Sequence, residues 1–291
     1  IDVYNRDYDT VVNVEGDKVG KVSVIDPATY DPVGSLLYDW QSTGFYALAY
    51  DAREAGIGDP YVFSYRGTNP SPGEDFPTSP LDASNGWVAA LGFPGGDGGQ
   101  AAQALDFYSI LMADLELENG QVTITGHSLG GGLAGLVAAV FGEEALLFDH
   151  MPYEHAAQEL YDWAASDQYP RDRFFDGAFP GPLDDGGIDA LATLGEFLSA
   201  VRLTLGSDYD DMPSYGGVRS PLDLHAMAML AHLIFADENG HTAWQEIGPQ
   251  LWDAWLSSEI AGTIPGVEGF VGDLGAITDV MQHGLAYSAL E

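Results

Sequence analysis

The chain has 291 residues, 46% of them hydrophobic, and it carries 45 acidic side chains against 9 basic ones, a formal net charge of -36. This length and apolar content predict a globular protein with a large buried core. The charge excludes nucleic acid as a partner, because a phosphate backbone would not be neutralised, and the lack of cysteine excludes disulfides, thiolate catalysis and Cys-rich zinc sites.

The excess of acidic residues has two interpretations. The simpler one is a solvated surface adapted to salt, as in halophilic proteins; the sharper one is that some carboxylates bind structural calcium. We expect no cofactor to be required. The chain begins with Ile1 rather than Met, which favours a mature or excerpted form. The longest apolar run, 122–141, is interrupted by a polar turn, so it predicts a buried strand, turn and helix and no transmembrane segment.

In the first part of the chain the pattern predicts strands, a helix and a long loop. Residues 11–24 alternate well enough for one or two strands with a turn, and 61–65 form a further strand. Residues 35–52 carry apolar side chains at helical spacing and predict a helix. Residues 69–100 are rich in Gly, Pro, Asp and Ser but hold several aromatic side chains, so we expect a lid there. A helix follows at 100–117.

Strands and helices alternate through the middle of the chain. Strands are predicted at 121–125, 145–148 and 201–205, with a helix at 129–141 after the first of them. Residues 151–199 contain many aromatic side chains and two breaks rich in Pro and Gly, and they predict a mostly helical insertion, a cap. The alternation favours a single α/β domain with a mainly parallel central sheet flanked by helices.

The sequence G-H-S-L-G at 126–130 matches the G-x-S-x-G turn that carries the nucleophilic serine of α/β-hydrolases. The two glycines let strand and helix approach, Ser128 takes a strained conformation, and the N–H of Leu129 points to where an oxyanion forms. A phosphate-binding loop is disfavoured because the G-K-[ST] ending is missing. We therefore predict an α/β-hydrolase fold over residues 1–291, with Ser128 as the nucleophile.

Two stretches resemble the class 3, or fungal-type, lipases and their bacterial secreted relatives. F-S-Y-R-G-T at 63–68 resembles the family's strand ending in F-R-G-[ST], and T-I-T-G-H-S-L-G-G at 123–131 resembles its T-G-H-S-L-G-G motif. G-F-Y-A-L-A-Y at 44–50 is similar to the bacterial branch. The resemblance is clear over 44–140 and patchy over 200–235. It implies a secreted, extracellular ester hydrolase.

The resemblance also implies further site residues. Directly after R-G the family has an oxyanion-hole residue, which is Thr68 here. Its backbone N–H and hydroxyl would join the N–H of Leu129 in stabilising an acyl-transfer intermediate. A lid after this strand is implied as well, at 69–100. Arg66 is expected to be structural and buried against a carboxylate.

The base should follow the nucleophile and the acid in the chain order Ser, Asp, His. His225 stands just before a predicted helix, similar to the H-x-[MI] context in which bacterial relatives carry their catalytic histidine. His283, near the C-terminus, also satisfies the order and is the alternative. His127 is expected to face away from the site, and His150 and His155 come too early in the chain.

The acid is expected after the strand predicted at 201–205. The family pattern D-x-V-P is best matched by Asp210 in the sequence D-D-M-P, with Met in place of Val. Asp208 and Asp211 are the neighbouring alternatives, and Asp149, at the end of an earlier strand, is a lesser one.

These residues predict a lipase or esterase that cleaves acyl glycerides or related lipid esters by two-step acyl transfer, in contact with a lipid–water interface. Phospholipase A1, polyester hydrolase and acyltransferase activities use the same triad and remain alternatives. A non-catalytic binding module on this scaffold is a further one. Aromatic side chains within 151–199 are expected either to line an acyl pocket or to pack with one another.

Overall fold

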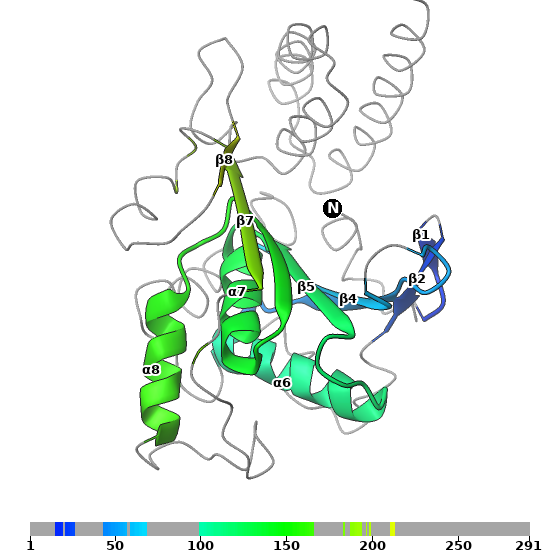
Figure 1. Cartoon of the computed structure of the whole chain (residues 1–291), viewed down its shortest axis with the longest axis horizontal. Coiled ribbons are helices and arrows are strands. Elements are labelled where there is room, and N and C mark those ends of the chain that lie inside the picture. Colours follow the sequence, from blue (N-terminus) through cyan, green and yellow to red (C-terminus); the bar gives the residue numbers. More distant parts are fainter. Residues whose placement is uncertain are drawn as a thin grey trace, which may run out of the picture.

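One eight-stranded sheet runs through the computed structural model of the chain (Figure 1). The structure describes residues 15–19, 21–26, 43–56, 59–68, 99–165, 183, 187–193, 196, 198 and 210–212. The strands are β1 (Lys18–Val19), β2 (Val22–Ile25), β3 (Ala47–Asp51), β4 (Tyr61–Tyr65), β5 (Val122–His127), β6 (Glu144–Phe148), β7 (Ile188–Thr193) and β8 (Asp210–Met212). Their order in the sheet is their order in the chain.

The sheet is mixed, and its two halves differ in direction. Strands β1 to β4 pair antiparallel, whereas β4 to β8 pair parallel. Parallel neighbours need crossover connections, and three of these contain helices: α6 (Gln100–Asp114), α7 (Leu129–Phe141) and α8 (Glu154–Ala165). The carboxyl ends of β4 to β8 therefore lie along one edge of the sheet.

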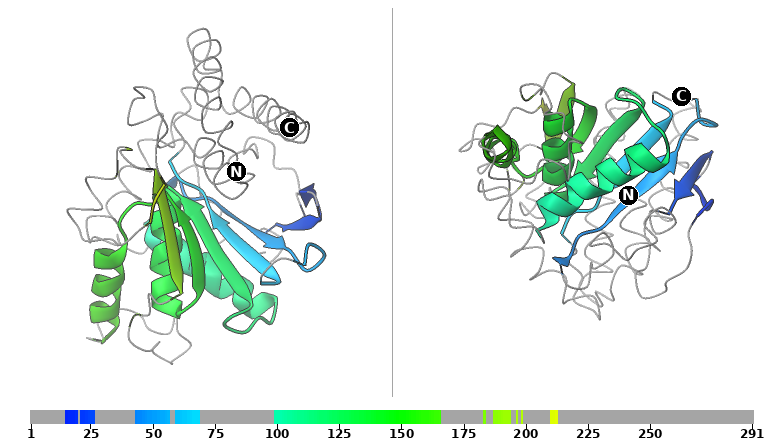
Figure 2. Two further views of the ribbon diagram at one scale, coloured as in Figure 1. Left: turned by 45° about the horizontal axis from the view of Figure 1, so that its top comes forward. Right: turned by 90° about the horizontal axis from the view of Figure 1, so that it is seen from below.

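Helix α7 is the centre of the helical layer. It contacts α6 on one side and α8 on the other, and it packs on β4, β5, β6 and β7. The views in Figure 2 show the three helices on the same face of the sheet. Its sequence explains this place, because every residue from Leu129 to Val140 is buried and small side chains allow a close approach. A Cβ added at Gly135, for example, would collide with the ring of Tyr153.

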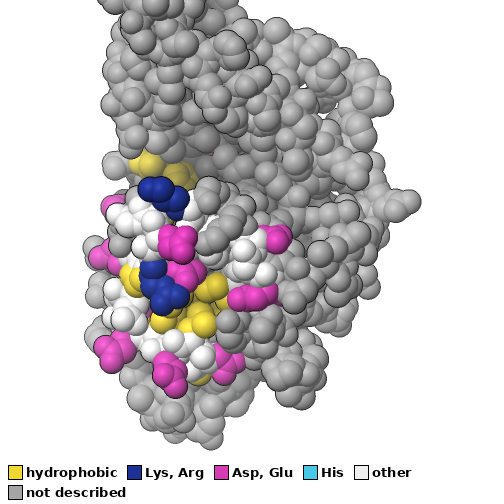
Figure 3. All heavy atoms as spheres, turned by 90° about the vertical axis from the view of Figure 1, so that its right-hand side faces the viewer, with side chains coloured by type: hydrophobic (Ala, Val, Ile, Leu, Met, Phe, Trp, Pro, Cys, Tyr) yellow, Lys and Arg dark blue, Asp and Glu magenta, His cyan; other side chains and the backbone are white. Residues whose placement is uncertain are grey.

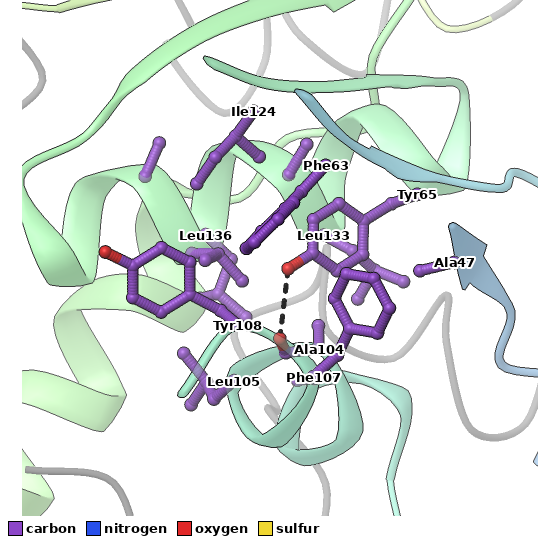
Figure 4. Packing of buried hydrophobic residues seen from close by; sticks show 14 of the residues in the cluster. Ala47, Phe63, Tyr65, Ala104, Leu105, Phe107, Tyr108, Ile124, Leu133 and Leu136 are labelled. Carbon is purple, nitrogen blue, oxygen red and sulfur yellow. Dashed lines mark hydrogen bonds between the residues drawn. The ribbon is translucent and has the colours of Figure 1, made fainter. Parts of the chain in front are cut away.

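The main core lies between this helical layer and the sheet, and aromatic rings fill it (Figure 4). Phe63 and Tyr65 of β4 meet Phe107 of α6 with ring centroids 5.6 and 5.4 Å apart. The hydroxyl of Tyr65 donates to the carbonyl oxygen of Ala104 at 3.1 Å, which satisfies a fully buried polar atom. The same hydroxyl is hard to ionise, because burial raises the pKa of Tyr65 well above 10.

Most of the expected elements are confirmed, and the helix predicted at 35–52 is wrong at its end. Residues 47–51 form β3, paired on both sides by β2 and β4. Ala47 and Ala49 belong to the main core, while Leu48 and Tyr50 are buried in a second cluster on the other face. A strand buried on both faces carries a continuous apolar run, which short-range periodicity does not distinguish from a helix.

The range 151–199, predicted to be a mostly helical cap, contains both a helix and a strand of the sheet. Helix α8 agrees with the prediction, but β7 at Ile188–Thr193 pairs with β6 and is part of the central sheet. A helical insertion can therefore extend only to the residues before β7. The strand predicted at 201–205 and most of the predicted lid, 69–98, lie outside the described residues.

Acidic and basic side chains are interspersed on one face of the described surface. On the face shown in Figure 3, Lys and Arg side chains lie in separate places, with acidic side chains between and around them. One exposed pair joins Arg53 and Asp51, with Nη2 2.6 Å from Oδ2, and such exposed pairs contribute little to stability. None of the helices in the described ranges is long and apolar enough to span a membrane.

Candidate active site

The turn between β5 and α7 holds Ser128 in a conformation that side chains rarely adopt. Its φ is 58° and its ψ is -126°, a region whose occupation costs roughly 1–3 kcal/mol. Backbone hydrogen bonds pin the turn: the N–H of Ser128 donates to Phe148 O at 3.0 Å, and its carbonyl accepts the N–H of Gly132 and of Met151. Strain that the surroundings impose in this way is a feature of functional sites.

The glycines at 126 and 130 are required by close backbone approach. A Cβ at Gly126 would lie closer than 3.0 Å to the backbone of Gly130, and a Cβ at Gly130 would lie that close to the backbone of Tyr65 and Arg66. Real Cβ atoms essentially never show such separations. The first and last positions of G-H-S-L-G are therefore set by the packing of β4, β5 and α7 around Ser128.

Two backbone segments leave the sheet beside Ser128 and could supply oxyanion donors. Leu129 is the first residue of α7, so its N–H has no acceptor within the helix and lies at the helix's positive end. Thr68 stands three residues after the end of β4, and the last residue of β4, Tyr65, pairs with Gly126. Thr68 and Leu129 thus follow neighbouring parallel strands at the same edge of the sheet.

Arg66 is buried and packs at the base of this segment. It is 3% exposed, its guanidinium carbon lies 5.5 Å from the centroid of the Tyr46 ring, and its Nη2 lies 3.4 Å from Gly44 O. The burial agrees with the structural role expected of Arg66, whereas these contacts are with a ring and a backbone carbonyl, and the expected carboxylate partner stays a prediction.

Two buried carboxylates stand at the same edge. Asp149 directly follows β6 and is 0% exposed; its Oδ1 accepts the N–H of Thr193 at 2.7 Å. Glu196 lies three residues after the end of β7 and is 2% exposed; its Oε2 accepts the N–H of Leu198 at 2.8 Å. Asp149 is the lesser alternative that the sequence predicts for the acid, whereas Glu196 is not predicted, because the sequence pattern does not identify β7 as a strand.

The predicted acids near 210 occupy the last strand. Asp210 and Asp211 both belong to β8, where they pair with Leu191 and Ala192 of β7. Asp208 lies outside the described residues.

Of the predicted bases, His225 and His283 lie outside the described residues. His150 follows β6 and is 0% exposed, with Nδ1 3.0 Å from Met151 O. Its Cβ is the nearest atom to a Cβ built on Gly131 in α7, so it packs beneath the turn. A histidine in that place is closed to a substrate, and His155 is exposed on α8. Neither is a better candidate than the two that were predicted.

The described residues include no group of three or more His, Asp or Glu side chains placed to hold a metal ion. The structural calcium considered from the composition therefore stays a prediction.

Comparison with known proteins places the chain near lipid-hydrolysing enzymes. Residues 21–154 match the model of a phospholipase-like family, the Tle-like phospholipase domain. This range includes β2 to β6, α6 and α7, and with them Thr68, Ser128 and Leu129. No curated protein matches the chain.

Two solved structures are similar to parts of the chain. The extracellular lipase LipA from Serratia marcescens is 18% identical, with a TM-score of 0.33 over 60% of this chain, and the match spans 28% of that lipase. The esterase LipW from Mycobacterium marinum is 13% identical, with a TM-score of 0.26 over 78% of this chain and 88% of the esterase. At these TM-scores neither likeness carries an argument.

The family model supports a lipase-like hydrolase that acts on esters, and the mixed sheet with its helical layer is consistent with an α/β-hydrolase-like fold. The family that matches is phospholipase-like, so the match supports a lipase-like hydrolase and does not show the class 3 lipases that the motifs resemble.

Proposed function

We propose that the protein is a serine carboxylic ester hydrolase whose nucleophile is Ser128. The observation that carries the proposal is the positive φ of Ser128 in a turn joining a parallel strand to a buried helix. This geometry lifts a serine hydroxyl above the edge of a sheet, next to the N–H groups at a helix start. The phospholipase-like match over the same residues supports the same chemistry.

The reaction proceeds through an acyl-enzyme. A histidine, which we expect to be His225, takes the proton of Ser128 as its Oγ attacks the ester carbonyl. The N–H groups of Leu129 and Thr68 stabilise the oxyanion. The histidine then protonates the leaving alcohol, and water, activated by the same histidine, releases the acid. A carboxylate orients the histidine and stabilises its cationic form.

Lipid esters are the proposed substrates, and the family match favours acyl chains of glycerophospholipids over neutral glycerides. The reaction needs only side chains and backbone N–H groups, so no cofactor enters the proposal. A lid within 69–100 and a helical insertion before β7 would then shape the acyl pocket, and we expect the protein to act outside the cell.

Substrate choice is tested with matched lipid dispersions. Hydrolysis of phosphatidylcholine in mixed micelles should release fatty acid faster than hydrolysis of triacylglycerol under the same conditions. Release of the phosphorylated headgroup instead of fatty acid would contradict a carboxylic ester hydrolase. Faster ester formation than hydrolysis when an acceptor alcohol is added would point to the acyltransferase alternative.

The nucleophile is tested with a fluorophosphonate probe and p-nitrophenyl esters. Wild-type protein should be labelled and active, whereas Ser128→Ala should lose both properties and keep the melting temperature of the wild type or exceed it, because alanine leaves the fold intact. Ser109→Ala, in α6, is the matched control and should keep both. Undiminished hydrolysis by Ser128→Ala would refute the proposal, and absence of labelling in the wild type would favour a binding module.

A further inference from the structure

The carboxylate of the proposed triad can be sought along the edge of the sheet where Ser128 stands. Parallel strands place their carboxyl ends at one edge, which is where ligands bind in α/β proteins. Ser128 follows β5, Asp149 follows β6, and Glu196 follows β7. We infer that Glu196 is the carboxylate that orients the base histidine, an inference that rests on the proposed function.

Backbone hydrogen bonds show which residues lie level across the sheet. The N–H of Ser128 donates to Phe148 O at 3.0 Å, and the N–H of Asp149 donates to Leu191 O at 2.9 Å. In parallel pairing these bonds place Ser128 level with Asp149, and Asp149 level with Ala192. Ala192 is therefore two strand spacings from Ser128, about 10 Å. Glu196 stands four residues after Ala192 in the chain, beyond the end of β7.

Glu196 is held in a fixed position at this exit. Its N–H donates to Thr193 O at 3.1 Å, which closes a turn directly after β7. Its Oε2 accepts the N–H of Leu198 at 2.8 Å, and Leu198 is 1% exposed and part of the main core. The Glu196 carboxylate is 2% exposed, so this turn holds it at one place directly after β7.

Asp149 has a different task, although it stands closer to Ser128 in the sheet. Its Oδ1 accepts the Thr193 N–H at 2.7 Å, and the Thr193 hydroxyl lies 3.4 Å from its Oδ2. Thr193 is thus held at its N–H by Asp149 and at its carbonyl by Glu196. Asp149 fixes the end of β7, from which the Glu196 turn starts.

Asp210 is less well placed. It pairs with Leu191, one row below Ala192, and β8 lies three strand spacings from β5, about 14 Å. An imidazole that joins a serine to a carboxylate through two hydrogen bonds spans roughly 8 Å in all. The backbone register therefore favours β7 over β8 as the source of the carboxylate. The chain order of Ser128, Glu196 and His225 also follows the Ser, Asp or Glu, His order of α/β-hydrolases.

In the reaction Glu196 stays ionised throughout. It accepts the Nδ1–H of the histidine while Nε2 takes the proton of Ser128 and later gives it to the leaving alcohol. No proton passes to Glu196, so it acts as a positioning residue through the histidine.

The test compares Glu196→Gln with Asp210→Asn, each assayed for kcat, KM and the pH dependence of kcat/KM on a p-nitrophenyl ester. Glu196→Gln should lower kcat by about 10²- to 10⁴-fold with little change in KM. The acidic limb of its pH profile should move to lower pH, because the cationic histidine loses its partner. Asp210→Asn should stay within about three-fold of the wild type, without a shift of the limb.

Glu196→Asp keeps the charge on a shorter side chain and should recover part of kcat. If Glu196→Gln does not fold, Glu196→Asp should still show lowered kcat with unchanged KM and a melting temperature near that of the wild type. The inference would be overturned if the acidic limb of the kcat/KM pH profile moved in Asp210→Asn. It would also be overturned if Glu196→Gln lost kcat while that limb stayed where it is in the wild type. Labelling of Ser128 in the wild type separates the two proposals, since its loss would remove the proposed function itself.

Discussion

Asp149 and Thr193 join the carboxyl ends of two neighbouring strands through a hydrogen bond of 2.7 Å from the Thr193 N–H to Asp149 Oδ1. Both residues are 0% exposed. Asp149 also has a φ of 41°, a left-handed conformation that Asp and Asn tolerate better than other side chains. This link connects β6, the strand after the Ser128 turn, to β7, the strand that leads to Glu196.

Replacing Asp149 should affect stability and catalysis together. Asp149→Ala leaves the buried Thr193 N–H without its acceptor, which should lower the free energy of unfolding by about 1–3 kcal/mol. Asp149→Asn should recover most of that loss, because its amide oxygen can still accept the N–H and Asn tolerates a positive φ. Urea unfolding measures the difference, and equal stability of the two variants would contradict the link. We expect kcat to fall with stability in Asp149→Ala.

The close approach at Gly130 predicts that even one added methyl group is not tolerated. Gly130→Ala should lower the free energy of unfolding by about 3 kcal/mol or prevent folding, because its Cβ meets the fixed backbone of Tyr65 and Arg66. Gly187→Ala is the matched control, since its Cβ would make only ordinary contacts at 3.5 Å. Thermal unfolding of both variants checks this, and a Gly130→Ala protein as stable as the control would refute the packing described for the turn.

The buried pair of Tyr108 and Glu143 predicts a pH dependence of stability. The Tyr108 hydroxyl donates to Glu143 Oε1 at 2.5 Å, and the Gly120 N–H donates to Oε2 at 3.0 Å. Burial raises the pKa of Glu143 above 4.5 despite these hydrogen bonds, which lower it. The folded protein thus binds this proton more tightly, so the stabilisation is fully present below pH 4.5 and is lost as the pH rises through the folded pKa.

Glu143→Gln removes this titration. Its free energy of unfolding should increase relative to that of the wild type as the pH rises from 4 to about 7, because only the wild type has to ionise a buried carboxyl. Glu159→Gln, on the exposed side of α8, changes the charge equally and serves as the control. Chemical unfolding at several pH values measures both. A relative stability of Glu143→Gln that stays constant with pH would refute the prediction.

Local signals in the sequence are sufficient to predict the turn at Ser128 and the neighbouring strands β4, β5 and β6, but not β3, β7 and β8. The close approach of Gly126 to Gly130 lies within G-H-S-L-G, so the motif predicts the turn at Ser128, whereas the close approach of Gly130 to Tyr65 and Arg66 depends on β4. The position of Thr68 could be predicted too, because it stands three residues after β4, a strand that the pattern at 61–65 indicates. Strand β7 is a short run bounded by glycine at 187 and, after Thr193, at 195, and its place depends on pairing with β6. Because β6 and β7 are far apart in the chain, their pairing produces no local residue pattern from which β7 could be predicted.

Glu196 was missed for the same reason. A carboxylate becomes a candidate only when the strand before it is known to end beside Ser128, and the aromatic residues of 151–199 favoured a helical cap instead. The signal in the sequence is the mainly apolar run I-D-A-L-A-T-L at 188–194, followed by G-E. The error at β3 is that a strand was predicted to be a helix. Its residues are buried on both faces of the sheet, so its apolar run resembles that of a buried helix.

The net charge of -36 predicts that salt stabilises the protein by screening, and that calcium can be distinguished from it. Raising NaCl from 0.1 to 1 M shortens the screening length from about 10 to 3 Å, which weakens the repulsion among the acidic side chains. We expect the melting temperature to rise by roughly 5 °C or more, since about 1 kcal/mol shifts it by 2–4 °C in a large domain.

Calcium at millimolar concentration, with ionic strength held constant by NaCl, should not raise the melting temperature further if screening alone operates. A further rise with calcium that magnesium does not reproduce would instead identify the structural calcium site considered from the composition, because calcium accepts more, and more flexibly placed, oxygen ligands than magnesium.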